Sequence, residues 1–344
     1  MTHTIESTHG ASAQAWSKEV MKEYLNHNPF YNFMGADSNS LIQTNEELTK
    51  QAGDAITVQL RSKLTGNGIT GAGTLKGNEE DLIFHTQKVE VDTLRHGVVL
   101  KGEMSEKRVA FNLRNQARDA LVDWACEKMK FDIISALTDT SVGRDRTRYI
   151  YGATDANWND THATALANVD TATDKLSTKL ISIAKRKAVL SGDRRVRPFQ
   201  IKSKDGKYEE VFVLFAHPYA VRDLMEDVAF REVNTNSSVA LADSVFVHGQ
   251  KVKGMWDGVM IVECDEMPLL AGTGAAGSDV AHCVLAGAQA ACVAWGKKTN
   301  YKEESDDYGH ENGFAIDEIR GVEKLVFNGV DHGVVNVFVS SIAD

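Results

Sequence analysis

Residues 54–103 read DAITVQLRSKLTGNGITGAGTLKGNEEDLIFHTQKVEVDTLRHGVVLKGE, and this stretch decides the fold. Apolar and polar residues alternate in residues 56–61 and again in residues 88–92, which predicts two strands with one apolar face each. Between them, residues 65–73 are rich in glycine and unsuited to a fixed local structure. We expect a long β-hairpin with a glycine-rich tip, whose arms of about ten residues reach roughly 33 Å.

An isolated two-stranded hairpin is only marginally stable in water. We therefore expect this hairpin to lie on another surface, and a neighbouring copy of the chain is the natural candidate. The hairpin residues expected at the interface between copies are Ile56, Val58, Leu60, Gly66, Gly68, Gly71, Gly73, Glu79, Glu80, Val89 and Val91.

Residues 1–50 have the character of an arm and not of a domain. A short amphipathic stretch, residues 16–25, ends before Pro29, which restricts the residue that precedes it. The aromatic cluster that follows has to be covered, either by the core of this subunit or by a neighbour. The expected anchors of the arm are Trp16, Phe30, Tyr31 and Phe33.

A long helix is expected after the hairpin. Ser105 is a suitable N-cap with Glu106 in the first turn, and apolar residues recur at helical spacing as far as Leu137. A helix over residues 104–137 would be about 50 Å long at a rise of ~1.5 Å per residue. We expect Trp124 to be buried on its inner face, in a series that consists of Leu113, Ala117, Ala120, Trp124, Phe131 and Ile134.

The rest of the chain mixes helices and strands. Helical spacing predicts a helix over residues 169–190 and another over residues 219–228. Residues 211–215 form a continuous apolar run, the mark of a strand buried on both faces. Further strands are expected at residues 245–247, 259–262, 280–285, 291–295, 325–327 and 335–339. Because these strands do not alternate regularly with helices, the predicted fold class is α+β.

The composition of the 344 residues, 42% apolar and 25% charged, is typical of a soluble protein with a substantial core. A formal charge of -10 argues against a dedicated nucleic-acid-binding protein, whose surface is normally basic. The four cysteines form no C-x-x-C motif and indicate reduced thiols of a cytosolic protein. The sequence begins without an apolar signal region and contains no long apolar run, so we expect neither secretion nor a membrane span.

The pattern G-x-G-x-x-G occurs at residues 66–71 and 272–277. It binds a dinucleotide only where a strand turns into a helix, and neither match precedes helix-like sequence. The histidines do not cluster with acids at ligand spacing, and no hydrolase, P-loop or zinc-protease motif occurs. We therefore expect no catalytic, cofactor-binding or metal-binding residues. A nucleotide-dependent enzyme remains an alternative that rests on these glycines alone.

Nine basic residues and only two acidic ones lie between Lys185 and Lys207. Acidic groups stand elsewhere, at residues 79–81, 263–266 and 303–307. Three interpretations stay open: solvated loops, matching of opposite charges between copies, or contact with nucleic acid. The basic residues expected at an interface between copies are Arg194, Arg195 and Arg197.

The order of arm, glycine-tipped hairpin, long helix and mixed body resembles the major capsid proteins of tailed double-stranded DNA bacteriophages, which share the Hong Kong ninety-seven fold. Over nearly the whole chain the sequence is similar to the podovirus-type, N-four-like capsid family. The matching stretches are residues 28–31, 33–35, 53–54, 77–80, 95–96, 102–106, 123–124, 216–218 and 327–334. These motifs are structural and bring no catalytic group with them.

The resemblance implies a division of the chain into five parts. These are an N-terminal arm at 1–50, an extended loop at 51–103, a peripheral domain at 104–205 with a spine helix at 104–137, an axial domain at 206–300, and return strands at 301–344 that close the body. Some relatives cross-link the extended loop through a lysine. Lys63 and Lys76 are present here, but nothing singles out either one, and we predict no cross-link.

The resemblance also implies a function. The expected role is self-assembly into the hexamers and pentamers of an icosahedral head that encloses double-stranded DNA, in a virion assembled in the bacterial host cytoplasm. The expected partners are other copies of the chain, a portal, a separate scaffolding protein, a decoration protein as a further candidate, and packaged DNA through non-specific contact. No cofactor and no membrane partner is implied. The alternative with the same fold is an encapsulin-like nanocompartment shell.

Overall fold

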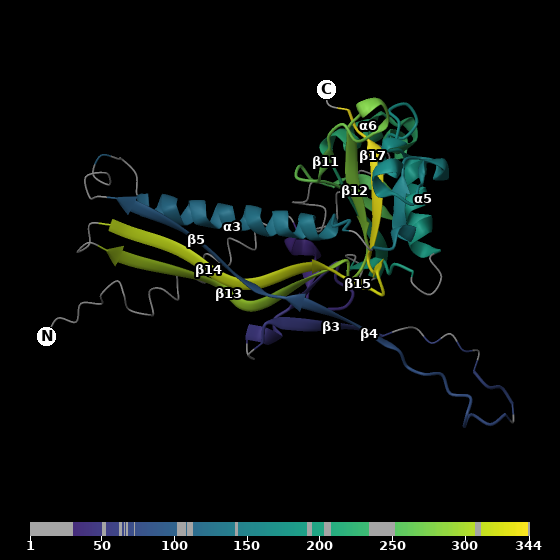
Figure 1. The fold of residues 1–344 in the computed structure, drawn as a ribbon, viewed down its shortest axis with the longest axis horizontal. Helices are drawn as coiled ribbons and strands as arrows, with labels where there is room; N and C mark the ends of the chain where they lie inside the picture. Colours follow the sequence, from purple (N-terminus) through teal and green to yellow (C-terminus); the bar gives the residue numbers. More distant parts are fainter. Residues whose placement is uncertain are drawn as a thin grey trace.

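The computed structural model describes residues 30–49, 53–61, 64, 66, 68–71, 73–101, 108, 113–141, 144–190, 195–202, 208–233, 252–306 and 311–342. These residues form an elongated half and a compact half that stands at one end of it (Figure 1). A hairpin of two strands projects from the region where the halves meet (Figure 1). The architecture is α+β, as the sequence predicts.

The elongated half is a five-stranded sheet covered on one face by a helix (Figure 1). In spatial order its strands are β1 (Met34–Gly35), β2 (Ile42–Asn45), β13 (Ala291–Asp306), β14 (Glu311–Lys324) and β5 (Asp92–Lys101). On β14, Phe314 and Ile316 are buried at alternate positions and share one apolar cluster with the helix α3 (Leu113–Leu137). This period of two is what a sheet with one covered face requires.

The buried face of α3 differs from the predicted one. Trp124 is only half-buried and stacks on His96 of β5 with ring centroids 4.3 Å apart, while Phe131 is 59% exposed. The prediction for Trp124 is confirmed in part, because its side chain packs against the apolar cluster between helix and sheet but is not fully buried. The prediction that Phe131 lies on the same apolar face is wrong, and smaller side chains form the buried strip. That strip consists of Ala117, Leu121, Val122, Ala125, Cys126, Met129, Ile133, Ile134 and Leu137.

The compact half contains an eight-stranded mixed sheet. Its main path is β6 (Tyr149–Tyr151), β17 (Val334–Ser340), β12 (Val280–Ala286), β8 (Tyr208–Ala216), β10 (Val259–Glu263) and β9 (Val252–Trp256), with β11 (Leu269–Leu270) beside β12 and β7 (Phe199–Lys202) beside β8. The helices are α4 (His162–Ala167), α5 (Thr178–Val189) and α6 (Pro218–Glu226). Every residue of β12 and of β17 is buried, which explains why both strands are mainly apolar. The polar His282 of β12 and Asn336 of β17 are hydrogen-bonded to each other at 2.9 Å.

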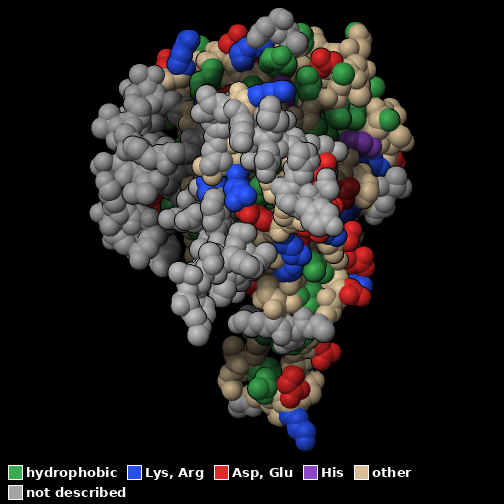
Figure 2. Space-filling view, turned by 90° about the vertical axis from the view of Figure 1, so that its left-hand side faces the viewer, with side chains coloured by type: hydrophobic (Ala, Val, Ile, Leu, Met, Phe, Trp, Pro, Cys, Tyr) green, Lys and Arg blue, Asp and Glu red, His purple; other side chains and the backbone are tan. Residues whose placement is uncertain are grey.

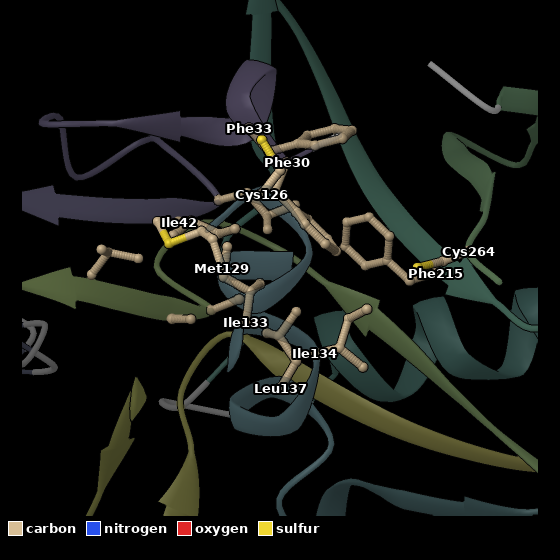
Figure 3. Close-up of a cluster of buried hydrophobic side chains, with 14 of the residues drawn as sticks. Phe30, Phe33, Ile42, Cys126, Met129, Ile133, Ile134, Leu137, Phe215 and Cys264 are labelled. Atoms are coloured by element: carbon tan, nitrogen blue, oxygen red, sulfur yellow. The ribbon is translucent and has the colours of Figure 1, made fainter. Parts of the chain in front are cut away.

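The two faces of this sheet belong to two apolar clusters. On β8, Phe212 and Leu214 pack with α5 and α6, whereas Val213 and Phe215 share a cluster with the end of α3. In Figure 3, Phe215 lies near Phe30, and the last turns of α3 contribute Met129, Ile133, Ile134 and Leu137 beside them. The two halves of the molecule are therefore joined by a continuous core.

Two hairpins complete the fold. One is formed by β3 (Ala55–Arg61) and β4 (Phe84–Glu90), which pair antiparallel in the region where alternation predicts strands. The other is formed by β15 (Val326–Phe327) and β16 (Val330–Asp331). Asn328 and Gly329 join the latter with φ of 52° and 77°, the backbone that an Asn-Gly turn provides.

Several expected boundaries change. The helix expected at 169–190 is confined to α5, and the strand at 245–247 and the start of a helix near Ser105 lie outside the described residues. The boundary expected at residue 205 divides one sheet, because β6 and α5 precede it yet belong with β8. The boundary at residue 300 falls inside β13. The chain thus crosses between the halves more often than the predicted linear division allows.

Candidate assembly surfaces

The root of the long hairpin lies in the chain's own core. Ile56, Val58 and Val89 are buried against Cys292, Ala294, Leu325 and Phe327, with Leu60 and Val91 partly buried beside them. For Ile56, Val58 and Val89 the predicted contact with a neighbouring copy is wrong. Their apolar face is the one that alternation predicts, but it packs on β13 of the same chain.

The loop of the hairpin, by contrast, is exposed. It forms the narrow projection at the bottom of Figure 2, where apolar, acidic and basic side chains stand side by side. Gly68 and Gly71 have φ of +66° and +71°, and a Cβ placed on either would have no other atom within 4 Å. A Cβ on Gly66 would meet the side chain of Glu80, and one on Gly73 would meet the side chain of Ile69. Apolar side chains exposed by half or more are Leu64 (54%), Leu75 (62%), Leu82 (50%), Ile83 (56%) and Phe84 (55%).

Sequence reasoning missed Leu82, Ile83 and Phe84. The available signal is that three apolar residues in succession break the alternation that a one-sided strand requires. Such a run presents apolar side chains on both sides of the returning arm. It is therefore a stronger marker of a partner-binding segment than the glycines of the tip.

Glu79 and Glu80, the two acidic residues predicted to lie at an interface, form hydrogen bonds within their own loop. A carboxylate oxygen of Glu80 accepts from the backbone N–H of Gly66 at 2.7 Å, and one of Glu79 accepts from the backbone N–H of Gly77 at 2.6 Å. The first bond ties the outgoing arm to the returning arm across the loop. Both carboxylates thus have partners within their own chain, which the acidic pattern of the sequence does not reveal.

The basic segment is also partly used inside the chain. Arg194 lies outside the described residues, and Arg195 is exposed. The Arg197 guanidinium donates to the carbonyl of Ser38 at 3.4 Å and to the side-chain oxygen of Gln289. Arg197 therefore fastens the segment before β2 to the loop before β13, and its role at an interface between copies stays a prediction.

The expected anchors of the arm are placed as follows. Phe30 and Phe33 are buried, with ring centroids 5.2 Å and 5.7 Å from that of Phe215. Tyr31 is 44% exposed, and Trp16 lies outside the described residues. The question that the sequence left open is thus answered for Phe30 and Phe33, because the core of their own subunit covers them.

The glycine patterns have no nucleotide-binding geometry. Gly66, Gly68 and Gly71 lie in the hairpin loop, and the segment 272–277 ends in a three-residue 3-10 helix that leads into the strand β12. The described residues also bring no three His, Cys, Asp or Glu side chains together in a way that could hold a metal ion. None of the described helices has the length and apolar character needed to span a bilayer.

The cysteines are unsuited to nucleophilic chemistry. All four are buried, and none of them forms a disulfide bond. Burial raises the pKa of Cys126 to about 11 and those of Cys264, Cys283 and Cys292 to about 12, so the reactive thiolate is scarce at neutral pH. These thiols serve as small apolar side chains of the core.

Residues 4–342 match a family model described as phage capsid protein. The chain belongs to this family. This capsid protein is structural and not an enzyme, and its place is the capsid of a phage virion.

Individual relatives agree with the family match. The capsid protein is 25% identical over 373 residues to the major capsid protein of Pseudomonas phage KPP25, covering 95% of this chain and 94% of the relative. It is similar to the capsid of Ralstonia phage GP4, with 26% identity, a TM-score of 0.78, and coverage of 91% of this chain and 90% of the other. The cyanophage Pam1 capsid asymmetric unit shares the fold, with a TM-score of 0.78, 24% identity, and coverage of 93% and 94%.

Proposed function

We propose that this capsid protein forms the hexamers and pentamers of an icosahedral head, and that the hairpin loop is the part that reaches a neighbouring copy. The observation that carries the proposal is the row of exposed apolar side chains on a loop that projects away from the body. Exposed apolar patches of this kind mark sites of protein association. Burial in the shell would remove that surface from water.

The hairpin then has two parts with different roles. Its root, β3 and β4, is held by the core of its own subunit through Ile56, Val58 and Val89. The described part of its loop would present Leu75, Leu82 and Ile83 to a partner. A fixed root would aim the loop, so that the neighbour meets a preorganised element and less entropy is lost on binding.

The two halves suggest places in the shell. We propose that the elongated half, with α3 as its spine, takes the peripheral position of a capsomer and that the compact half takes the position at the capsomer axis. A portal, a separate scaffolding protein, a decoration protein and packaged DNA are the further partners proposed, with assembly in the host cytoplasm. The charge of -10 restricts contact with DNA to local basic groups.

The phage head is preferred to an encapsulin-like nanocompartment shell. Both the family description and the curated relative name phage capsid proteins. A nucleotide-dependent enzyme is not supported, since neither glycine pattern precedes an α-helix.

The test is deletion of residues 66–77 from the full chain. We expect a folded, soluble subunit whose melting temperature is close to that of the wild type but which forms no complete shells in negative-stain micrographs. A matched variant keeps the length of the loop and replaces the apolar residues Leu75, Leu82 and Ile83 by serine. This variant should also form no complete shells, because the loop is still long enough to reach a neighbouring copy but has lost its apolar contacts. Normal shells from both variants would refute the role of the loop.

A further inference from the structure

The end of α5 presents a basic and apolar surface. Val189 is 42% exposed and Leu190, the residue that caps the helix, is 75% exposed. Leu190 lines a hollow of about 490 Å³ together with Ile150, Ile183, Arg186, Lys187 and one acidic residue, Asp155. Three cations follow one another at the end of this helix: Lys185 pairs with Asp257, Lys187 donates to the carbonyl of Tyr149, and Arg186 is exposed. We call Ile183, Arg186, Lys187, Val189 and Leu190 the α5-end patch.

The segment that follows α6 presents the opposite character. Met225 is 36% exposed, Val228 54% and Val233 43%. Residues 225–233 contain three acidic residues and one basic one, Arg231. We call Met225, Glu226, Val228, Glu232 and Val233 the α6-end patch. Both patches are thus apolar, and their charges are of opposite sign.

The two patches cannot meet within one subunit. Asp227 accepts hydrogen bonds from the backbone N–H of Thr178 at 3.0 Å and from its hydroxyl at 2.8 Å, so the α6-end patch adjoins the first residue of α5. The α5-end patch lies at the other end of the same twelve-residue helix. At ~1.5 Å per residue, the two ends are about 18 Å apart.

We propose that the α6-end patch of one copy seats on the α5-end patch of the next copy. This inference rests on the proposed function and names the contact that would join compact halves around a capsomer axis. Val228 and Met225 would enter the hollow beside Leu190, and Glu226 would face the exposed Arg186. Two different patches that bind head to tail generate closed rings when the rotation between copies permits closure. Opposite charges fix the register and disfavour wrong pairings.

Thiol cross-linking in assembled particles tests this contact. The chain has only four cysteines, all of them buried, so a newly introduced exposed thiol reacts selectively with a short bismaleimide. We expect Leu190→Cys combined with Val228→Cys to give a ladder of covalent oligomers that ends at closed pentamers and hexamers. Each single cysteine variant should give no cross-link. A dimer from Val228→Cys alone would reveal a two-fold contact and overturn the proposal.

A charge exchange supplies the second readout. Arg186→Glu and Glu226→Arg should each reduce the ladder of the double-cysteine protein, and the two changes together should restore it. Both residues lie on the surface, and unchanged melting temperatures of the unassembled variants would show that folding is not affected. If the wild type forms no shells, the proposed function itself fails. If shells form normally but the double-cysteine protein gives no ladder, only the present inference fails.

Discussion

The Lys324 ammonium lies 3.0 Å from a carboxylate oxygen of Asp331, and each of the two side chains is only 1% exposed. Lys324 also donates to the carbonyl of Asp139, just after α3, and Asp331 accepts from the amide of Asn336 on β17 at 3.0 Å. Arg148 donates to the carbonyls of Asp331 and His332. This buried polar network therefore fastens α3 and β14 of the elongated half to the sheet of the compact half.

Lys324→Met should strongly destabilise the subunit. The substitution leaves the Asp331 carboxylate buried without its cation, and removal of one partner of a buried ion pair typically costs ~3–5 kcal/mol. Urea unfolding of the unassembled subunit measures the change. The double variant Lys324→Met with Asp331→Asn should recover part of the loss, because no unpaired charge then remains. Equal stability of the wild type and Lys324→Met would contradict the assignment.

The free energy of unfolding should fall as the pH falls below neutral. Burial lowers the pKa of His282 from 6.5 to about 3 and that of His332 from 6.5 to about 4, and it lowers the pKa values of His162 and His217 in the same direction. Between pH 6.5 and about 4 the unfolded chain therefore binds protons that the folded chain excludes. Each strongly shifted histidine costs up to ~1.4 kcal/mol per pH unit in that window.

Denaturant unfolding of the unassembled subunit between about pH 7.5 and 4.5 checks this slope. His282→Gln removes one of the two strongly shifted histidines and should flatten the dependence, even if it lowers stability at every pH. A slope that is the same in the wild type and in this variant would exclude His282 as a source.

Gly321→Ala should disturb the root of the hairpin. A Cβ at position 321 on β14 would collide with the backbone carbonyl of Glu90, where β4 ends. Gly313→Ala is the matched control on the same strand, since its Cβ would meet its nearest neighbour, the carbonyl of Glu304, at 3.6 Å, an ordinary contact. We expect faster amide hydrogen exchange in residues 55–61 and 84–90 and defective shells for the first variant only. Unchanged exchange in Gly321→Ala would contradict the close packing.

Two residues of α3 should respond differently to truncation. Met129 is fully buried in the cluster between sheet and helix, whereas Phe131 is 59% exposed two positions later. Met129→Ala should cost ~2–5 kcal/mol of unfolding free energy through lost burial and a cavity. Phe131→Ala should change stability by less than about 0.5 kcal/mol, as surface substitutions do. Thermal unfolding of both unassembled variants decides whether the observed or the predicted face of α3 is the inner one.

The elements that could be predicted from the sequence are those with a strong local pattern. The alternation around Ile56 and Val89 predicts β3 and β4, and the apolar run 211–215 predicts the centre of β8. The second half of β13 has no such pattern. Residues 296–306 are mainly polar and become a strand because they pair with β14, through two irregularities in register. Cross-strand pairing of this kind has no local signature.

The interface residues were predicted less well for a related reason. An apolar face indicates that something covers a strand, but not which chain supplies the cover. At Ile56 and Val58 the cover is Leu325 and Phe327, which lie far along the same chain. Likewise, the charge of Arg197 gives no hint that Gln289 is its partner. Long-range contacts within one chain and contacts between copies produce the same sequence pattern, so a single sequence does not distinguish them.

The topology of the elongated sheet also determines when the subunit can fold during synthesis. Its early strands, β2 and β5, have to wait for β13 and β14, the two long strands that pair with them near the end of the chain. A nascent chain released before residue 291 therefore lacks the centre of this sheet, and with it the surface on which α3 and the root of the hairpin pack. We therefore expect prematurely terminated products to be unable to form this sheet, so that only finished subunits enter the growing shell.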